Sequence, residues 1–212
     1  SPLHKPKMNN RYILLAADLV SWIFTPFYMP TLAFIVLLMF SYLKALTPGY
    51  KIAMILLVYL FTVLFPRIMI YIYRRINGWT KHQMSRRERR YVPYTISIIC
   101  YSALLFIMET FHMPHFTSAI VAAALLIQVI CAVVNNWIKI STHAAASGGV
   151  IGMLFAFSII FNFNAINWLA LCVLLCGCVC TARMILRQHT YKEIIFGVLI
   201  GIASGCGAVI VL

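Results

Sequence analysis

The segment from Ala182 to Glu193 carries ionisable side chains between two long apolar runs. His189 and Glu193 are four residues apart, a spacing that places both side chains on one face of a helix. A carboxylate at this position can accept the imidazole N–H, fix the tautomer and leave the other ring nitrogen as a nucleophile or base. Arg183, near the end of the preceding run, can hold a phosphate through its fork of N–H donors. These residue types suit phosphoryl transfer.

The composition indicates a membrane protein. Of the 212 residues, 63% are hydrophobic and only 10% are charged, and the mean hydropathy is +0.95. Several apolar runs reach the roughly 20 residues that a helix needs to cross a bilayer. We expect an all-α fold, a polytopic transmembrane helix bundle of about six spanning helices with an N-terminal segment that is either interfacial or crossing. Residues 1–212 are expected to form a single integral membrane domain.

The charge balance indicates which classes of molecule the protein can bind. The net charge is +13, from 17 Lys and Arg against 4 acidic residues. In a soluble protein this balance would suggest nucleic acid, but this chain has no polar domain for that role. Anionic lipid headgroups and phosphate groups fit better. We therefore expect a membrane lipid phosphate as substrate, the lipid bilayer as surroundings and no nucleic acid, while the sequence leaves the oligomeric state open.

The order of apolar runs gives the expected topology. An N-terminal run is broken by Pro26 and Pro30. Because residues 1–7 are polar and no A-x-A-like site follows the first apolar run, we expect no cleavable signal peptide. The runs that we expect to be helical cover residues 30–46, 51–73, 91–111, 115–138, 143–161, 166–182 and from 191 to the end.

Three polar stretches are separated by pairs of helices. They are the arginine-rich stretch 74–90, the segment around His143 and the segment around His189. An even number of crossings between two loops places both loops on the same side of the membrane. We therefore expect the three stretches to converge on one site.

The second and third of these stretches resemble motifs of the type 2 phosphatidic acid phosphatase superfamily of membrane lipid phosphatases. The third family motif, S-R-x5-H-x3-D, is matched by Ala182-Arg183-x5-His189-x3-Glu193, with Ala in place of Ser and Glu in place of Asp. The second, P-S-G-H, resembles Ile140-Ser141-Thr142-His143. Thr142 replaces the glycine of that motif.

The first family motif, K-x6-R-P, has no direct match. The arrangement from Arg86 to Arg89, followed by Pro93, resembles a divergent bacterial version of that loop. The resemblance covers residues 81–212, which we expect to be a phosphatase-like core with three motifs.

The resemblance implies a role for each matched residue. His189 would attack phosphorus and form a phosphohistidine, and Glu193 would orient its ring. His143 would protonate the leaving oxygen of the lipid and then activate water. The implied phosphate-binding residues are Arg183, Arg86, Arg89, Arg90 and Ser141. The scheme needs no metal ion and no other cofactor.

The expected activity is that of a metal-independent hydrolase of lipid metabolism. It would remove phosphate from a phosphomonoester or diphosphate of a membrane lipid: a phosphatidate-like lipid, a prenyl diphosphate or lipid A. Two alternatives stay open. One is a phosphotransferase that uses the same site, and the other is an inactive protein that binds anionic lipid. The replacements at Thr142 and Glu193 are the features that favour inactivity.

Other patterns have simpler interpretations. The arginine-rich stretch also fits the positive-inside signal of a cytoplasmic loop. Cysteines recur every four residues at Cys172, Cys176 and Cys180, and glycines at Gly197, Gly201 and Gly205; we interpret both as close helix packing rather than metal binding.

The resemblance implies a multi-pass protein of the bacterial inner (cytoplasmic) membrane. The positive-inside rule favours a cytoplasmic site, while the resemblance favours a periplasmic one. The sequence leaves the side of the site open.

Overall fold

A computed structural model describes residues 9–40, 46–80, 83 and 86–211. Every regular element in this part of the chain is helical, which confirms the predicted all-α class. Residues 1–7, on which the signal-peptide expectation depends, lie outside the described part.

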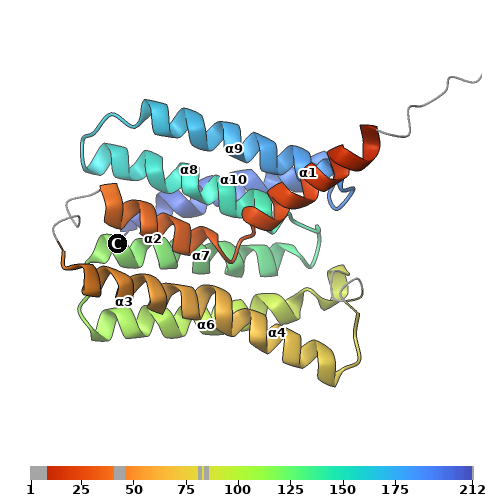
Figure 1. Ribbon diagram of the computed structural model, residues 1–212, viewed down its shortest axis with the longest axis horizontal. Coiled ribbons are helices and arrows are strands. Elements are labelled where there is room, and N and C mark those ends of the chain that lie inside the picture. The colour runs from red at the N-terminus through yellow and green to blue at the C-terminus, as the bar shows by residue number, and fades with distance from the viewer. Residues whose placement is uncertain (1–8, 41–45, 81–82, 84–85, 212) are drawn as a thin grey trace, which may run out of the picture.

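The helices follow one another with short connections (Figure 1). Their bounds are α1 (Asn9–Ile23), α2 (Met29–Phe40), α3 (Pro48–Tyr59), the π-helical turn η2 (Leu60–Leu64), α4 (Phe65–Ile76), the 3-10 turn η3 (Arg87–Arg89), α6 (Tyr91–Thr110), α7 (His115–Val134), α8 (Thr142–Ile160), α9 (Ile166–Ile185) and α10 (Tyr191–Val211).

Within the described part, six helical stretches are long and apolar enough to cross a membrane. They are the continuous run α3–η2–α4 and the helices α6, α7, α8, α9 and α10. The prediction of about six spanning helices is therefore confirmed, and the chain is a multi-pass membrane protein. The crossing expected over residues 30–46 is described only as the 12-residue α2, because residues 41–45 lie outside the described part.

The π-helical turn ends at Leu64, two residues before Pro66. Proline has no N–H to donate to the preceding turn, so the local helix widens before it. Inside this turn, the Thr62 hydroxyl donates to the Val58 carbonyl at 2.8 Å, and it lies 3.2 Å from the Thr31 hydroxyl of α2. The run α3–η2–α4 therefore continues as one helix that is joined to α2 by a buried polar contact.

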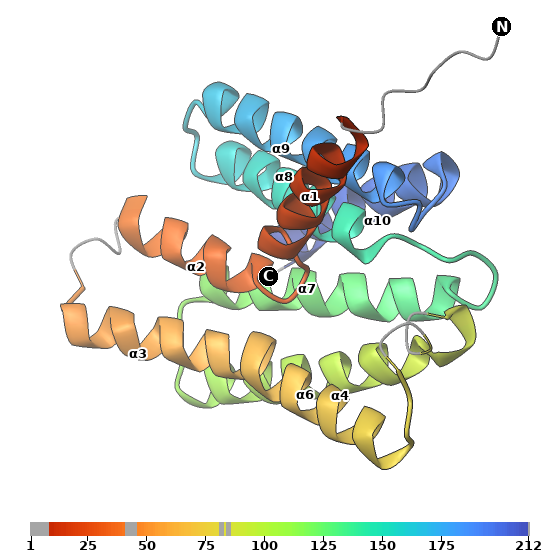
Figure 2. The same cartoon turned by 45° about the vertical axis from the view of Figure 1, so that its right-hand side comes forward.

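The polar loops gather at one end of the bundle (Figures 1 and 2). Residues 77–80 and 86–90, the loop 135–141 and the turn 186–190 lie at this end. The turns 111–114 and 161–165 lie at the opposite end. The prediction from the number of crossings, that the three polar stretches share a side, is confirmed.

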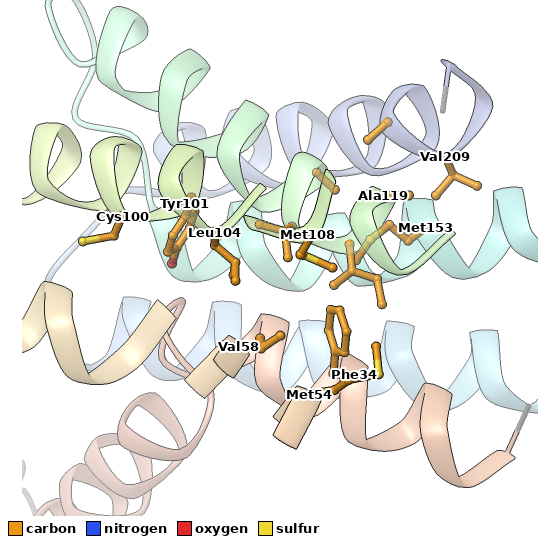
Figure 3. Close-up of a cluster of buried hydrophobic side chains, with 14 of the residues drawn as sticks. Phe34, Met54, Val58, Cys100, Tyr101, Leu104, Met108, Ala119, Met153 and Val209 are labelled. Atoms are coloured by element: carbon orange, nitrogen blue, oxygen red, sulfur yellow. The ribbon is translucent and has the colours of Figure 1, made fainter. Parts of the chain in front are cut away.

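Tightly packed apolar side chains hold α2, α3, α6 and α7 together (Figure 3). The largest completely buried side chain is Tyr101 of α6, and Phe34, Met54, Leu104 and Met108 are at most 2% exposed. This core packs the four helices against one another.

Helices α8 and α10 pack backbone against backbone. A Cβ at Gly201 would overlap the carbonyl oxygen of Ala145, and one at Gly205 would overlap the carbonyl oxygen of Gly149. Small residues permit such an approach between membrane helices. The packing interpretation of the glycine stripe is confirmed. The approach also brings the start of α8 beside the start of α10.

We expect Gly201→Ala to destabilise the protein, because the added methyl group must displace the backbone of α8. Overpacking of this kind costs about 1–3 kcal/mol. Gly207→Ala is the matched control, since nothing lies within 4 Å of a Cβ at this position on the same helix. Thermal unfolding of the purified variants in detergent measures both effects. Equal unfolding midpoints for the two variants would contradict the packing described for α8 and α10.

Candidate active site

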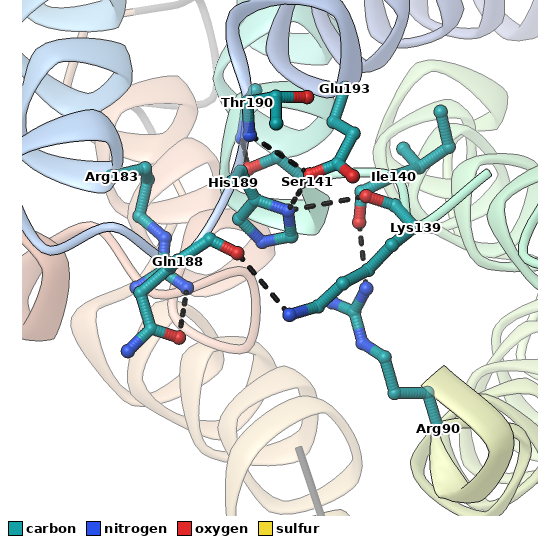
Figure 4. A network of polar contacts seen from close by, with 10 residues as sticks. Arg90, Lys139, Ile140, Ser141, Arg183, Gln188, His189, Thr190 and Glu193 are labelled. Atoms are coloured by element: carbon teal, nitrogen blue, oxygen red, sulfur yellow. Dashed lines mark hydrogen bonds and ion pairs between the residues drawn. The ribbon is translucent and has the colours of Figure 1, made fainter. Parts of the chain in front are cut away.

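His189 and Glu193 meet at the start of α10 (Figure 4). The Nδ1 atom of His189 lies 3.2 Å from Oε2 of Glu193, and the same oxygen accepts the Thr190 backbone N–H at 3.0 Å. Glu193 therefore acts as the glutamate of a capping box, which fixes its side chain at the helix start. The contact predicted from the four-residue spacing is present, and the longer glutamate reaches the ring.

The hydrogen bonds of His189 determine its tautomer. Nδ1 also lies 3.2 Å from the carbonyl oxygen of Lys139. A carbonyl oxygen only accepts, so Nδ1 carries the proton and Nε2 keeps its lone pair. The side chain is 2% exposed. This arrangement leaves an oriented imidazole whose Nε2 keeps its lone pair.

Three cations surround His189, and two of them tie neighbouring segments together. Arg90 donates through Nη1 to the Ile140 carbonyl at 2.9 Å, which joins the start of α6 to the loop before α8. Lys139 donates through Nζ to the Gln188 carbonyl at 3.3 Å. These two hydrogen bonds thus hold the loop before α8 to the start of α6 and to the turn before α10.

Arg183 is the third cation. Its Nη2 lies 3.5 Å from the Gln188 side-chain oxygen, a long contact, while its buried Nε has no partner among the described residues. A buried donor of this kind normally has an acceptor. An oxygen of a bound phosphate would supply one.

The surroundings keep His189 unprotonated. Burial lowers the pKa of His189 to about 3, and the charges of Arg90, Arg183 and Lys139 contribute to the shift. Burial, followed by the charge of Arg90, also lowers the pKa of Lys139. The imidazole is therefore neutral at physiological pH, as a nucleophile requires.

This shift predicts a pH dependence of stability. Because the pKa of His189 is about 6.5 in the unfolded chain and about 3 in the folded protein, the unfolded chain binds more protons between these values. The folded protein should therefore lose stability as the pH falls below about 6.5. Thermal unfolding in detergent between pH 7 and pH 4 should show a smaller loss for His189→Gln than for the wild type. His115→Gln, at an exposed position, is the control and should keep the wild-type slope. An unchanged slope in His189→Gln would contradict a neutral buried imidazole.

His143 lies in the first turn of α8. Its Nε2 lies 3.2 Å from the carbonyl oxygen of Ser21 in α1, and the charges of Arg183 and Arg90 act on its ring. His143 thus belongs to the same end of the bundle as His189, and α1 covers it. Because a carbonyl oxygen only accepts, Nε2 is the protonated nitrogen in this arrangement.

Ser141 forms the N-cap of α8. Its completely buried Oγ accepts the Ala144 N–H at 3.4 Å, and its backbone N–H donates to the Glu193 carbonyl at 3.4 Å. The residue therefore fixes where α8 begins relative to α10. The predicted contact between its hydroxyl and phosphate stays a prediction.

The arginines of the first loop are not equivalent. Arg90 reaches the site, whereas the Arg89 guanidinium lies over the Trp79 ring, 4.2 Å from its centroid. The Nη1 of Arg89 is buried without a hydrogen-bond partner in the described part, and Arg86 is exposed. Phosphate binding by Arg86 and Arg89 stays a prediction.

Two features of the site were not predicted from the sequence. Lys139 supplies a cation, and its position two residues before Ser141 in a predicted site loop was an available signal. No sequence pattern predicted that α1 lies against the site. In the structure, the Ser21 carbonyl contacts His143, and the charge of Asp18 acts on Arg183. Among the residues that the structure describes, no three His, Cys, Asp or Glu side chains are grouped as metal ligands would be.

Comparison with known proteins supports the resemblance. The family model of the PAP2 superfamily matches residues 135–212. This range contains the second and third motifs, with His143, Arg183, His189 and Glu193, and begins after the arginine-rich loop. The searches of curated proteins and of solved structures gave no match. Residues 135–212 of this multi-pass membrane protein are thus similar to the PAP2 superfamily.

Proposed function

We propose that the protein is a membrane lipid phosphate phosphatase that acts through a phosphohistidine intermediate. The observation that carries the proposal is the state of His189. Its Nδ1–H is held by Glu193 and a carbonyl oxygen, its Nε2 is left with a lone pair, and its ring lies among three cations. The PAP2 match supports the same reaction class.

In the first step, Nε2 of His189 attacks phosphorus and the bond from phosphorus to the lipid oxygen breaks. Arg90, Arg183 and Lys139 stabilise the charge that develops on the phosphoryl oxygens. His143, protonated when the anionic substrate is bound, gives its Nε2 proton to the leaving oxygen. The products of this step are phosphohistidine and a lipid alcohol, or a lipid monophosphate where the substrate is a diphosphate.

In the second step, water attacks the phosphohistidine while His143 takes a proton from it. The phosphorus–nitrogen bond breaks, inorganic phosphate leaves and His189 regains its lone pair. In the free protein the carbonyl oxygen of Ser21 lies beside Nε2 of His143. The lipid oxygen would take this place, so α1 must shift when substrate binds.

The location of the site supports a lipid as the substrate. The polar cluster lies at the end of six membrane-spanning stretches, the depth at which the phosphate groups of membrane lipids are found. The contact between Arg90 and the Ile140 carbonyl supports a phosphatase-like core that extends before residue 135, as proposed for residues 81–212. We place the protein in the bacterial inner membrane, with a phosphatidate-like lipid, a prenyl diphosphate or lipid A as substrate.

Phosphate release from a panel of lipid phosphates tests the proposal. The purified protein in detergent is incubated with each lipid and, as a tail-free substrate, with p-nitrophenyl phosphate, both with and without a chelator. We expect inorganic phosphate to appear and to be insensitive to the chelator. Transfer of phosphate to an added alcohol, without free phosphate, would identify a phosphotransferase. Lipid binding without either product would identify an inactive lipid-binding protein.

A further inference from the structure

The helix α1 lies across the candidate active site and is held there by few contacts. It runs obliquely over α8 and α9, whereas α2 runs along the bundle (Figures 1 and 2). Its buried side chains are Ala17 and Ser21, which are 4% and 6% exposed, and the other side chains of residues 11–23 are exposed or half-buried. A segment that buries so little apolar surface is among the first to separate from a folded protein.

The last turn of α1 contacts the proposed general acid. Ser21 lies in this turn, where backbone carbonyls have no donor within the helix. Its carbonyl oxygen lies 3.2 Å from Nε2 of His143. In the proposed reaction this nitrogen gives its proton to the leaving oxygen of the substrate. In the free protein α1 therefore holds the proton that the reaction needs.

The same face of α1 carries a negative charge. Asp18 is three residues before Ser21, a spacing that places both on one face of the helix. The charge of Asp18 acts on Arg183, a proposed phosphate ligand. Helix α1 thus brings an acceptor oxygen to the general acid and a negative charge toward a phosphate ligand. A phosphate ester would bring the same two features to the site, so it competes with α1 for both.

The outer face of α1 is apolar. Tyr12, Leu15, Leu19 and Trp22 recur at intervals of three and four residues, and each is at least 57% exposed. An amphipathic helix with such a face binds at the boundary between lipid headgroups and acyl chains, where tyrosine and tryptophan are enriched. The lipid surface is therefore the partner that this face fits, and α1 can leave the bundle without exposing its apolar face to water.

The connection to α2 allows α1 to move while α2 stays in place. Residues 24–28 join the two helices and include Pro26. The α2 side is fixed to the bundle, because Arg67 donates through Nη1 to the Tyr28 hydroxyl at 2.7 Å and the Thr31 hydroxyl lies 3.2 Å from the Thr62 hydroxyl. A pivot of α1 therefore falls between its last turn and Tyr28.

We propose that α1 is an autoinhibitory lid, which docks on His143 through the Ser21 carbonyl in the free protein and is displaced into the membrane interface when a phosphate group binds. The inference rests on the proposed function for the roles of His143 and Arg183. Its test uses anion binding, which needs no turnover. The lid lowers the apparent affinity for phosphate, because only the fraction of molecules with α1 displaced can bind.

Ala17→Leu in the full chain tests the lid, because the larger side chain enters the buried contact of α1 and weakens its docking. Ala16→Leu, the same change at the neighbouring exposed position, is the matched control. Binding of inorganic phosphate to the purified proteins in detergent is measured by calorimetry. We expect Kd to fall about 2- to 10-fold in Ala17→Leu, the range for loss of one hydrogen bond from the closed state, and to stay at the wild-type value in Ala16→Leu. Unchanged or weaker binding by folded Ala17→Leu would overturn the lid.

Hydrogen–deuterium exchange of the wild type tests the displacement without any variant. Peptides that cover α1 should exchange faster in the presence of inorganic phosphate, because the displaced helix loses its packing on the bundle. Slower or unchanged exchange would show that α1 is a fixed part of the site and would overturn the proposal.

Asp18→Asn adds a test of the docked charge. It should lower Kd for phosphate in the wild type and have no further effect in Ala17→Leu, where α1 has already left the site. Additive effects would show that Asp18 acts on the site from one unchanged position and would contradict the lid. If phosphate displaces α1 but no lipid phosphate is hydrolysed, the phosphatase proposal fails and the lid stands. If lipid phosphates are hydrolysed but phosphate leaves α1 in place, the lid fails alone.

Discussion

His189→Ala should release no measurable phosphate from any lipid phosphate or from p-nitrophenyl phosphate. The reason is the arrangement at Nε2. It is the nitrogen left with a lone pair when Nδ1–H is held by Glu193 and the Lys139 carbonyl. Removing the ring removes the atom that forms the covalent bond, so the whole two-step route is lost rather than slowed. Phosphate release under single-turnover and steady-state conditions measures the effect.

The control for this experiment is His115→Ala. His115 is an exposed histidine at the start of α7, at the end of the bundle opposite the site. It should keep wild-type turnover, and circular dichroism should show the same helix content for both variants. Trapping the wild type with a radiolabelled phosphate substrate should label His189. Unchanged turnover in His189→Ala would rule out the phosphohistidine route.

His143→Ala should lose most activity toward lipid phosphates and much less toward p-nitrophenyl phosphate. A lipid alkoxide is a poor leaving group that needs a proton as its bond to phosphorus breaks, whereas p-nitrophenolate leaves with little help. General acid catalysis contributes about 10²–10⁴-fold, so this is the range expected for the lipid. The loss for formation of phosphohistidine from p-nitrophenyl phosphate should be smaller.

The acid role of His143 is tested by comparing the activity lost toward lipid phosphates with the activity lost toward p-nitrophenyl phosphate. A burst of p-nitrophenolate followed by slow turnover is expected in His143→Ala, because the second step still needs a base to activate water. The lipid alcohol and inorganic phosphate are measured separately in the same reactions. Equal losses for both leaving groups, without a burst, would contradict an acid role for His143 and indicate that it only shapes the pocket.

Much of the architecture depends on local properties, and these are readable in the sequence. Hydrophobic runs of about 20 residues determine which segments can span a bilayer, because backbone polar groups in lipid must be paired within a helix. The number of runs between polar loops determines which loops share a side. The pairing of His189 with Glu193 depends only on a four-residue spacing within one helix start. The glycine stripe of α10 likewise indicated a close helix contact.

The composition of the site depended on long-range packing. The spacing of arginines in the first loop did not distinguish Arg90 from its neighbours, because the distinction comes from where α6 begins relative to the loop before α8. Lys139 became a member of the site through its contact with a turn 49 residues away in the chain. Such contacts depend on how whole helices pack rather than on any local pattern.

The same division applies to α1 and to the buried core. The sequence by itself showed an apolar N-terminal segment with a break at Pro26, and it determined the spans, the shared side and the paired His189 and Glu193. Only the tertiary structure placed the Ser21 carbonyl beside His143, and only it buried the Tyr101 hydroxyl without a hydrogen-bond partner in the described part of the chain. The physical reason is that each of these features joins helices from distant parts of the chain, whose relative positions are determined by side-chain packing across the bundle.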